Sequence, residues 1–322
     1  MIAVRCTDYG PPEELELLEV DDPRPGPGQV VVRIHAAAVN YPDVLAIAGR
    51  YQVREPVPFT PGSEFAGEVV AVGAEATLRP GDRVFGTVPT GAFAEQVVVD
   101  QVAVSAVPDK VSFADAAAFG VTYRTAYHAL RSVAEVGADD WVVVLGAAGG
   151  VGLAAVDLAK TMGARVVAAS SGAKLAVCRE RGADAAIDYD NEDLKSRIRE
   201  LTGGGAHVVL DPVGGPYAEP ALRALRRNGV FVTLGYAAGS IPAIPLNLVL
   251  LKAIAVRGME LRTFAMDHPE QSTRDVAELQ RLFAEGRIRP HIGARFPLSR
   301  TAEALRLVAD RGAVGKVVIE VA

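Results

Sequence analysis

A chain of 322 residues, half of them hydrophobic and 22% charged, can bury a sizeable core and is too long for one typical domain. Its net charge of -6 gives no basic surface for nucleic acid or an anionic membrane, and its two cysteines, Cys6 and Cys178, exclude a disulfide framework. The start has no signal-peptide pattern and no apolar run could cross a membrane, so we expect a cytoplasmic protein with neither a nucleic-acid nor a membrane partner.

The first third of the chain is typical of a β-rich domain. Turn-forming proline and glycine residues at 21–29 and 79–82 separate short segments with many valines. These segments are predicted strands at 30–39, 66–73, 82–88 and 94–100. We expect a compact, mostly antiparallel and barrel-like domain over residues 1–120.

From residue 121 onward the pattern changes to an α/β rhythm. After an Ala-rich helical segment at 113–130, predicted strands alternate with helices, which indicates βαβ units and a doubly wound parallel sheet over 121–260. The strands are expected at 142–145, 165–170, 185–189, 207–214 and 229–236, with a closing strand within 254–261. The remaining segment, 261–322, has a predicted helix at 273–285 and a last strand at 315–321. It is too short to fold alone, so we expect it to return to the β-rich domain.

The segment 142–160 reads VVVLGAAGGVGLAAVDLAK and leads from an apolar strand through a glycine-rich turn into an apolar helix. A dinucleotide pyrophosphate binds at such a turn, because the first N–H groups of the helix have no intrahelical partner and its dipole favours anions. Gly149 would let the backbone approach the phosphates and Gly152 would let the helix pack on its strand, while Ala147 replaces the usual first glycine. This context favours a dinucleotide site over a tight turn without a ligand.

The end of the second strand of this domain bears on the choice of dinucleotide. NAD-binding domains place an acidic residue there, about twenty residues after the turn, to hold the ribose 2′-hydroxyl. Residues 169–171 carry no carboxylate. Ser170, Ser171 and Lys174 instead offer hydroxyl groups and a cation for an adenosine 2′-phosphate, although Lys174 could also be a solvated lysine at a helix start. The sequence therefore predicts NADPH.

The chain lacks the residue patterns of several other chemistries. Its histidines and cysteines show no metal-ligand spacing, and it has neither a G-x-S-x-G motif nor a P-loop lysine. Dehydrogenases of simple alcohols commonly use zinc to polarise the C–O bond. We therefore expect no metal, and a hydride acceptor that needs little Lewis-acid help, such as a quinone or a carbon–carbon double bond conjugated to a carbonyl.

Seven segments carry a resemblance to a known family: VNYPD (39–43), PFTPGSEFAGEVVAVG (58–73), RPGDRVFG (79–86), GAFAEQVVV (91–99), GVTYRTAYHAL (120–130), GAAGGVG (146–152) and LDPVGG (210–215). In this order they resemble the zinc-independent quinone oxidoreductase (ζ-crystallin-like) branch of the medium-chain dehydrogenase/reductase superfamily, over essentially the whole chain. The resemblance implies a GroES-like β-domain, completed by the C-terminal segment, beside a Rossmann domain with NADPH between them. Ser63 stands where zinc-dependent relatives carry a ligand histidine, and Asn40 lies in the region of their first ligand cysteine.

The resemblance also implies a set of cofactor-binding residues. Ser170 departs from the family pattern, since many relatives have glycine there. The implied contacts are Gly149, Gly150 and Val151 for the pyrophosphate, Ser170, Lys174 and Tyr189 for the 2′-phosphate, Thr125, Val213, Gly214, Gly235 and Tyr236 for the nicotinamide half, and Lys316 where the C-terminal segment approaches the cofactor.

Asn40 and Tyr51 are the candidates for catalysis on the substrate side. The amide of Asn40 could hydrogen-bond the acceptor oxygen or the nicotinamide ribose, and the phenol of Tyr51 could donate to the developing oxyanion. Each has a structural alternative: Asn40 as a turn residue before Pro42, and Tyr51 as a partly buried loop aromatic. Asp43 is interpreted as structural.

The leading functional hypothesis is an NADPH-dependent, zinc-free reductase of quinones or enones. An enoyl-thioester reductase remains open, because Arg50 and Arg54 flank Tyr51 and could meet a phosphopantetheine substrate. A non-catalytic NADPH-binding protein, like the lens crystallins of the family, is the third reading. The apolar strand at 254–261 is an edge that needs covering, so we expect a homodimer.

Overall fold

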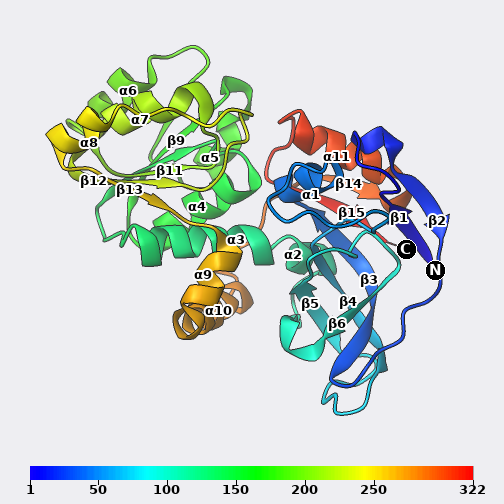
Figure 1. The fold of residues 1–322 in the computed structure, drawn as a ribbon. Helices are drawn as coiled ribbons and strands as arrows, with labels where there is room; N and C mark the ends of the chain where they lie inside the picture. The colour runs from blue at the N-terminus through cyan, green and yellow to red at the C-terminus, as the bar shows by residue number, and fades with distance from the viewer. Residues whose placement is uncertain (322) are drawn as a thin grey trace. The chain divides into compact units, whose positions relative to one another are not determined.

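The structure is a computed structural model that describes residues 1–321 and divides into two units (Figure 1). The first contains Met1–Val121 and the segment from Pro290 onward, and the second contains Thr122–Arg289. The chain thus returns to the first unit later than the predicted residue 261. The reason is that Phe264 and Asp275 belong to the second unit, where the ring of Phe264 stacks 4.3 Å from that of His128 and Asp275 Oδ2 lies 2.9 Å from His128 Nδ1.

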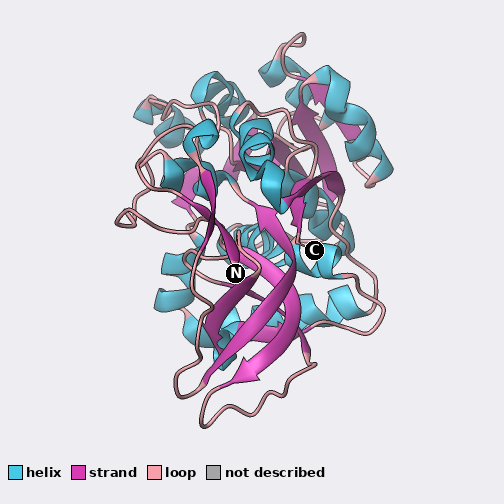
Figure 2. Cartoon of the chain, turned by 90° about the vertical axis from the view of Figure 1, so that its right-hand side faces the viewer, coloured by secondary structure: helices cyan, strands magenta, loops and turns pink. Residues whose placement is uncertain are grey.

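The first unit is a β-rich unit that the end of the chain completes (Figure 2). In the described residues its main sheet has seven strands, with the order β14-β15-β3-β4-β5-β7 and β6 paired to β3, beside a two-stranded ribbon of β1 and β2. Pairing is antiparallel except between β14 and β15. Its elements are β1 (Ile2–Arg5), η1 (Pro12–Glu14), β2 (Glu16–Glu19), β3 (Gln29–Val39), α1 (Tyr41–Ile47), β4 (Glu64–Val72), β5 (Arg83–Thr87), β6 (Gln96–Asp100), η2 (Gln101–Ala103), β7 (Val104–Ala106), α2 (Phe113–Ala117), β14 (Ile292–Pro297), η6 (Leu298–Arg300), α11 (Thr301–Ala309) and β15 (Lys316–Glu320).

The core of the first unit combines residues from both ends of the sequence. Val32 and Ile34 of β3 are fully buried with Leu305 of α11 and Ile319 of β15. Apolar side chains drive this association because their burial removes surface from water. In the β15–β3 pair Val317 lies opposite Val39. Lys316, the first residue of β15, therefore lies beside Asn40, the residue that follows β3.

The second unit is a Rossmann unit. In the described residues its six strands are all parallel, in the order β10-β9-β8-β11-β12-β13, and the order reverses between β8 and β11. Valines fill the central strands because both faces of a parallel sheet are covered. The helix α3 (Gly120–Tyr127) begins in the last two residues of the first unit and continues into the second. The other elements of the second unit are a π-helix (His128–Val133), β8 (Trp141–Leu145), α4 (Gly150–Thr161), β9 (Arg165–Ser170), η4 (Gly172–Lys174), α5 (Leu175–Glu180), β10 (Ala185–Asp188), α6 (Leu194–Leu201), β11 (Ala206–Asp211), η5 (Gly215–Tyr217), α7 (Ala218–Arg223), β12 (Leu225–Thr233), α8 (Leu246–Lys252), β13 (Ala255–Gly258), α9 (Leu261–Asp267) and α10 (Pro269–Ala284).

These two units confirm the predicted fold class, a doubly wound parallel sheet with a discontinuous β-rich partner. The helix predicted at 113–130 is broken into α2, α3 and the π-helix. The break follows from a side chain: the N–H of Val121 donates to Glu64 Oε1 at 2.7 Å, and a Cβ on Gly120 would come 3.1 Å from the same oxygen.

Candidate functional site

The carboxyl ends of four neighbouring strands of the second unit, β9, β8, β11 and β12, carry most of the residues predicted to bind a cofactor. In open α/β sheets, ligands bind outside these ends where the strand order reverses, which is here between β8 and β11. The N–H of Ala147, after β8, donates to the carbonyl of Ala169 in β9 at 3.1 Å. The turn after β8 is therefore tied to the strand that ends at Ser170.

The glycine-rich turn has the shape that a pyrophosphate requires. In the fingerprint the first glycine makes the tight turn, but this chain has Ala147 at that position. The preceding residue, Gly146, adopts a positive φ of 58° and provides the tight turn instead. A Cβ on Gly152 would come 2.2 Å from the Gly146 carbonyl oxygen, so only glycine lets α4 begin this close to the turn.

The first turn of α4 is open to an anion. Its N-cap is Gly149, which has no side chain to accept hydrogen bonds from the N–H groups that follow. Gly149, Gly150 and Val151 are all partly exposed. Because α4 is twelve residues long, its dipole adds to the attraction for negative charge. The residues present fit a dinucleotide pyrophosphate.

The loop after β9 brings together the residues predicted to hold a 2′-phosphate. Ser170 ends β9 and is buried, while Ser171 and Lys174 share one turn, in which the Lys174 N–H donates to the Ser171 carbonyl at 3.0 Å. Tyr189 follows β10, donates its N–H to the Ser170 carbonyl at 3.3 Å, and stacks its ring 4.1 Å from that of Tyr217. The four predicted residues thus lie around one loop.

Asp188 is a residue of this loop region that sequence reasoning missed. It lies opposite Ser170 in the β10–β9 register, and a Cβ on Gly172 would come 2.2 Å from its Oδ2. A hydrogen bond from the Asn191 side chain, followed by backbone N–H donors, lowers the pKa of this carboxyl. A carboxylate is therefore present near the predicted 2′-phosphate residues, but it ends β10 and not β9, the strand at whose end NAD-binding domains carry their acidic residue.

The loops after β11 and β12 are joined to each other. Asp211 Oδ1 accepts hydrogen bonds from the N–H groups of Val213 (2.8 Å) and Gly214 (2.7 Å). Gly214 has a positive φ, and a Cβ there would come 2.8 Å from the ring of Tyr236. Gly235 precedes that tyrosine, so the predicted residues of the two loops lie side by side. Thr125, the other residue predicted for the nicotinamide half, is half-buried on α3.

Asp211 itself was not predicted. Its side chain is fully buried, and within the part of the chain that is described its Oδ2 has no hydrogen-bond partner. Burial raises the pKa of this carboxyl, against the two backbone N–H donors that lower it. The residue shapes the 211–214 loop through one oxygen only.

In the first unit, Asn40 and Lys316 meet in a buried polar cluster. Lys316 Nζ lies 2.6 Å from Asn40 Oδ1, 3.1 Å from Glu64 Oε2 and 3.3 Å from the Val39 carbonyl oxygen. Asn40 Nδ2 in turn donates to Glu64 Oε2 at 3.1 Å and lies 3.5 Å from Ser63 Oγ. The antiparallel β15–β3 pair brings these residues together, because Lys316 begins β15 and Asn40 follows β3.

The cluster engages the polar groups of its two predicted members, Asn40 and Lys316. The described acceptors match the three N–H groups of the Lys316 ammonium, so Lys316 holds Asn40 and Glu64 in place. Asn40 is the N-cap of α1, and its amide is engaged on both sides by Glu64 and Lys316.

Asp43 and Ser63 extend the same cluster. Asp43 Oδ2 accepts from the Asn40 N–H at 2.7 Å, and Ser63 Oγ donates to Asp43 Oδ1 at 3.0 Å. Burial raises the pKa of Asp43 to about 6, against the hydrogen bonds from Asn40 and Ser63. Asp43, Glu64 and Lys316 are all less than 5% exposed, whereas Ser63 is partly exposed.

Tyr51 follows α1, the helix that Asn40 caps. It is half-buried in the loop after α1, where its N–H donates to the Leu45 carbonyl at 3.1 Å. The neighbouring Arg54 stacks 4.4 Å over the ring of Tyr9. The structure therefore leaves the catalytic role of Tyr51 as a prediction.

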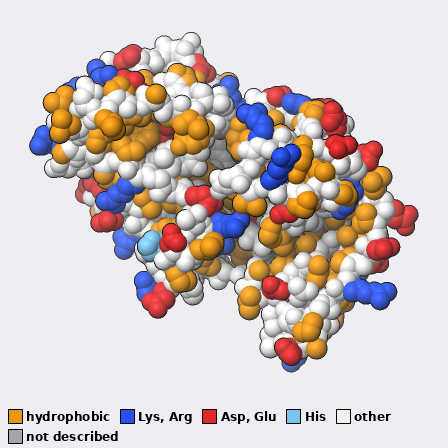
Figure 3. All heavy atoms as spheres, viewed as in Figure 1, with side chains coloured by type: hydrophobic (Ala, Val, Ile, Leu, Met, Phe, Trp, Pro, Cys, Tyr) orange, Lys and Arg blue, Asp and Glu red, His pale blue; other side chains and the backbone are white. Residues whose placement is uncertain are grey.

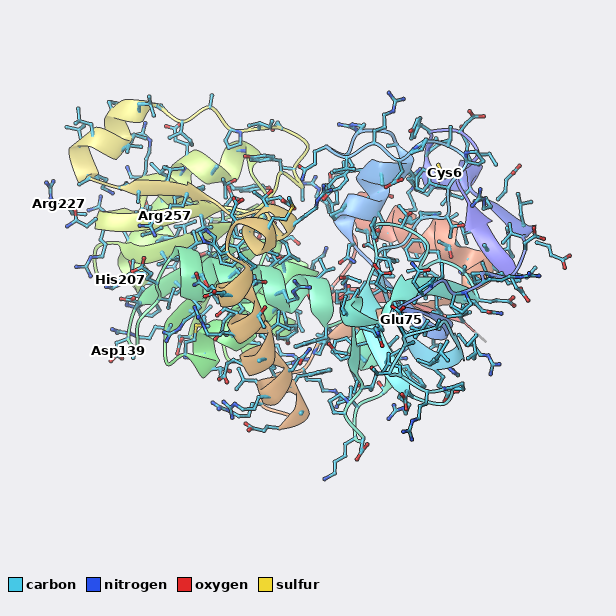
Figure 4. All side chains as sticks on the ribbon, turned by 60° about the horizontal axis from the view of Figure 1, so that its bottom comes forward. Cys6, Glu75, Asp139, His207, Arg227 and Arg257 are labelled. Atoms are coloured by element: carbon cyan, nitrogen blue, oxygen red, sulfur yellow. The ribbon has the colours of Figure 1, made fainter. Side chains whose placement is uncertain are left out.

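His207 and the two cysteines have structural surroundings. The side chain of His207 is labelled in Figure 4. Its Nδ1 accepts from the Trp141 N–H at 2.9 Å near the amino end of β11, whereas the loops above follow the carboxyl ends of their strands. Cys6 and Cys178 are buried, and burial raises the pKa of both thiols. In residues 1–321, no group of three or more His, Cys, Asp or Glu side chains is placed to hold a metal ion, and no helix has the length and apolarity to cross a membrane.

Two family models match the chain, one in each unit. Residues 26–109 match the model described as alcohol dehydrogenase GroES-like domain, and residues 150–280 match the model described as zinc-binding dehydrogenase. A β-rich GroES-like unit and a Rossmann unit with a glycine-rich turn define the medium-chain dehydrogenase/reductases, a class of oxidoreductases.

Known relatives place the chain more narrowly. It is 38% identical to a quinone oxidoreductase-like protein 2 homolog of Nematostella vectensis, over 98% of this chain and 88% of the relative. A quinone oxidoreductase of Escherichia coli, solved in complex with NADPH, is 28% identical with a TM-score of 0.92, over 99% of this chain and all of that one. A structure described as an NAD-dependent alcohol dehydrogenase is 31% identical with a TM-score of 0.91, over the full length of both. The chain belongs to the quinone oxidoreductase branch of the medium-chain dehydrogenase/reductase superfamily.

Proposed function

We propose that the chain is an NADPH-dependent reductase that transfers hydride to quinones or α,β-unsaturated carbonyls and works without zinc. The observation that carries this proposal is the row of four loops at the carboxyl ends of β9, β8, β11 and β12, in a chain of the quinone oxidoreductase branch. The loops after β8 and β9 would hold the diphosphate and adenosine end. Those after β11 and β12, with Thr125, would hold the nicotinamide half.

The preference for NADPH rests on this chain's own residues, because its solved neighbours differ in the cofactor that they name. Ser170 and Ser171 provide hydroxyl groups, and Lys174 provides a cation in the same loop. Charge-assisted hydrogen bonds to a phosphate are roughly twice as strong as those between neutral groups. The ionised Asp188 opposes this preference, since a like charge repels a 2′-phosphate.

The zinc-free reading rests on Lys316. Asn40 and Ser63 stand in the regions where zinc-dependent relatives carry ligands, and the ammonium of Lys316 lies 2.6 Å from the Asn40 side chain. A divalent cation at that place would have to bind beside a buried positive charge, with an amide and a hydroxyl in place of thiolate and imidazole. The donor set is poor for zinc and well matched to an ammonium.

A bound reduced nicotinamide supplies the hydride in this proposal. The chain's residues orient the coenzyme, exclude water and stabilise the negative charge that develops on the acceptor oxygen. Tyr51 is the candidate hydrogen-bond donor that stabilises the charge on that oxygen. Tyr51→Phe is expected to lower kcat with little change in NADPH affinity, and an unchanged kcat would leave Tyr51 a packing residue.

The test is the oxidation of NADPH by the purified protein with a quinone, an enone and crotonyl-CoA in parallel. We expect turnover with the first two. Turnover only with crotonyl-CoA would favour an enoyl-thioester reductase, and tight NADPH binding without oxidation would favour a non-catalytic NADPH-binding protein. Metal analysis of the active protein completes the test: a stoichiometric transition metal required for turnover contradicts the zinc-free proposal.

A homodimer is part of the proposal. The edge strand β13 exposes backbone hydrogen-bonding groups, and next to it in sequence α8 exposes Leu246 (78%), Leu250 (79%) and Leu251 (67%). Figure 3 shows apolar side chains gathered on this part of the second unit. Light scattering is expected to give a dimer, and Leu250→Glu to give a monomer with an unchanged fold. A monomeric wild-type protein would contradict this proposal.

A further inference from the structure

The buried cluster around Asn40 holds more acidic groups than its cation can neutralise. Among the residues described there, Asp43 and Glu64 provide two carboxyl groups, and Lys316 provides one ammonium. An isolated ionised carboxylate is costly to bury, and a group in this position takes up a proton instead. The charge balance of the cluster therefore calls for one proton on one of the two carboxyls.

The hydrogen bonds decide which carboxyl holds that proton. Glu64 receives three charged or N–H donors: Lys316 Nζ, Asn40 Nδ2 and, at 2.7 Å, the N–H of Val121. N–H donors can only donate, so they stabilise the ionised form of Glu64. Asp43 receives one N–H donor, and its second partner is the hydroxyl of Ser63, which can either donate or accept.

This arrangement couples the proton of Asp43 to the direction of the Ser63 hydroxyl. When Asp43 is ionised, Ser63 donates to its Oδ1, as in the structure. When Asp43 is protonated, its O–H can donate to Ser63 Oγ, and the serine hydroxyl is then released to donate elsewhere. Burial raises the pKa of Asp43 to about 6, so both states are populated near neutral pH. The charged groups around Asp43 are Lys316, which lowers its pKa, and Glu64, which raises it.

We propose that Ser63 delivers a proton to the acceptor and that Asp43 stores it. This inference rests on the proposed function, because it requires an acceptor reduced on the side of Asn40 and Ser63. Asn40, the residue predicted for that oxygen, has its amide engaged by Lys316 and Glu64, whereas Ser63 is partly exposed. Ser63 is thus the polar member of the cluster that can reach a bound molecule.

The proton and electron balance is as follows. The acceptor gains hydride at an electron-poor carbon, and the π electron pair of the conjugated system moves to its oxygen. Ser63 Oγ gives its proton to that oxygen, and a new O–H bond forms there. At the same time the Oδ1–H bond of Asp43 breaks and Ser63 regains a proton. Asp43 is left ionised and takes a proton from water through Ser63 after the product leaves.

Two variants of Ser63 test the delivery step. Ser63→Ala is expected to lower kcat about 100-fold, the lower end of what general acid catalysis contributes, with an unchanged dissociation constant for NADPH. Ser63→Thr keeps the hydroxyl and is expected to restore most of kcat. The matched control is Ser112→Ala, which removes another serine that donates to a carboxyl, Asp115 at 2.8 Å, in the same unit. It should leave turnover unchanged.

Infrared difference spectroscopy tests the store without any cofactor or acceptor. The full-length protein should show a carboxylic-acid C=O band that is lost as the pH rises through about 6. This band should disappear in Asp43→Asn and shift in frequency in Ser63→Ala, while Ser112→Ala keeps it. The proposal is overturned if Asp43→Asn leaves every titrating band in place, or if Ser63→Ala turns over like the wild type.

The two readouts separate this inference from the proposed function. If no quinone or enone oxidises NADPH, the proposed function fails, and the delivery role of Ser63 fails with it. The infrared band then still decides whether Asp43 holds a proton. If turnover is normal and the band is absent, the proposed function stands and the proton store is refuted.

Discussion

Replacing Lys316 by methionine should destabilise the first unit strongly and leave the second unit unaffected. The variant keeps an unbranched apolar chain in place of the lysine methylenes but removes the ammonium from a pair whose side chains are 4% and 1% exposed. Glu64 is then left as a buried carboxylate without its cation, and Asn40 Oδ1 loses its donor at 2.6 Å. Removing one partner of a buried ion pair costs about 3–5 kcal/mol. The folding equilibrium of the first unit should fall at least about a hundredfold.

The single tryptophan makes the two units distinguishable in one experiment. Trp141 begins β8 in the second unit, so its fluorescence during urea unfolding reports on that unit. Hydrogen exchange at the amides of β3 and β15 reports on the first. We expect fast exchange in β3 and β15 of Lys316→Met and an unchanged tryptophan transition. Arg295→Met is the matched control. It removes an exposed ion pair to Glu320, which lies on β15 as Lys316 does, and should cost at most about 1 kcal/mol.

The double variant Lys316→Met with Glu64→Gln, together with the two single variants, forms a double-mutant cycle. If the loss comes from an uncompensated charge, the neutral pair should be more stable than the Lys316 variant alone. Strictly additive losses, or a tryptophan transition that moves as far as the exchange rates of β3 and β15, would refute the reasoning.

Four further outcomes are expected. Lys174→Ala should weaken the binding of NADPH about tenfold or more and that of NADH little. Asp188→Asn should strengthen the binding of NADPH, since it removes a negative charge from the same loop. Equal effects on the affinities for both coenzymes in titrations would contradict these roles. Gly152→Ala should abolish NADPH binding in the same titrations, because its Cβ would come 2.2 Å from a carbonyl oxygen of the turn. Burial lowers the pKa of His128 below its usual 6.5, so the stability that the neutral ring contributes is complete above pH 6.5 and is lost as the pH falls below that value. His128→Asn keeps a donor to Asp275 and should flatten this pH dependence of the unfolding free energy, measured by urea titrations at several pH values. An unchanged slope would exclude His128 as the source of the pH dependence.

The Rossmann unit could be predicted from the sequence nearly strand by strand. Each of its strands is an apolar run followed by a helix, and the glycine-rich turn at 146–152 is a local signal whose residues are contiguous. The predicted loops after β8, β9, β11 and β12 then fall at one edge of the sheet as a consequence of parallel pairing. Local patterns and one topological rule were enough for this half of the site.

The polar cluster of the first unit could not be predicted in the same way. Asn40 and Lys316 are separated by 276 residues, and their contact depends on the register between β3 and β15. Asp188 was missed for a related reason: its position near Gly172 comes from the pairing of β10 with β9 and not from any motif. Nothing in the sequence around Asp43 distinguishes a buried carboxyl that holds a proton from a helix-capping one.

The late return of the chain to its first unit also has a consequence for biosynthesis. The second unit is one continuous segment, Thr122–Arg289, and can fold as soon as it leaves the ribosome. The first unit cannot close at that stage, because β3 pairs with β15, which follows the second unit in the chain. During translation the Ala36–Val39 part of one β3 edge stays open while the whole coenzyme half matures, because β6 covers only the earlier part of that edge. Nascent chains that stall before residue 316 would expose this part to aggregation.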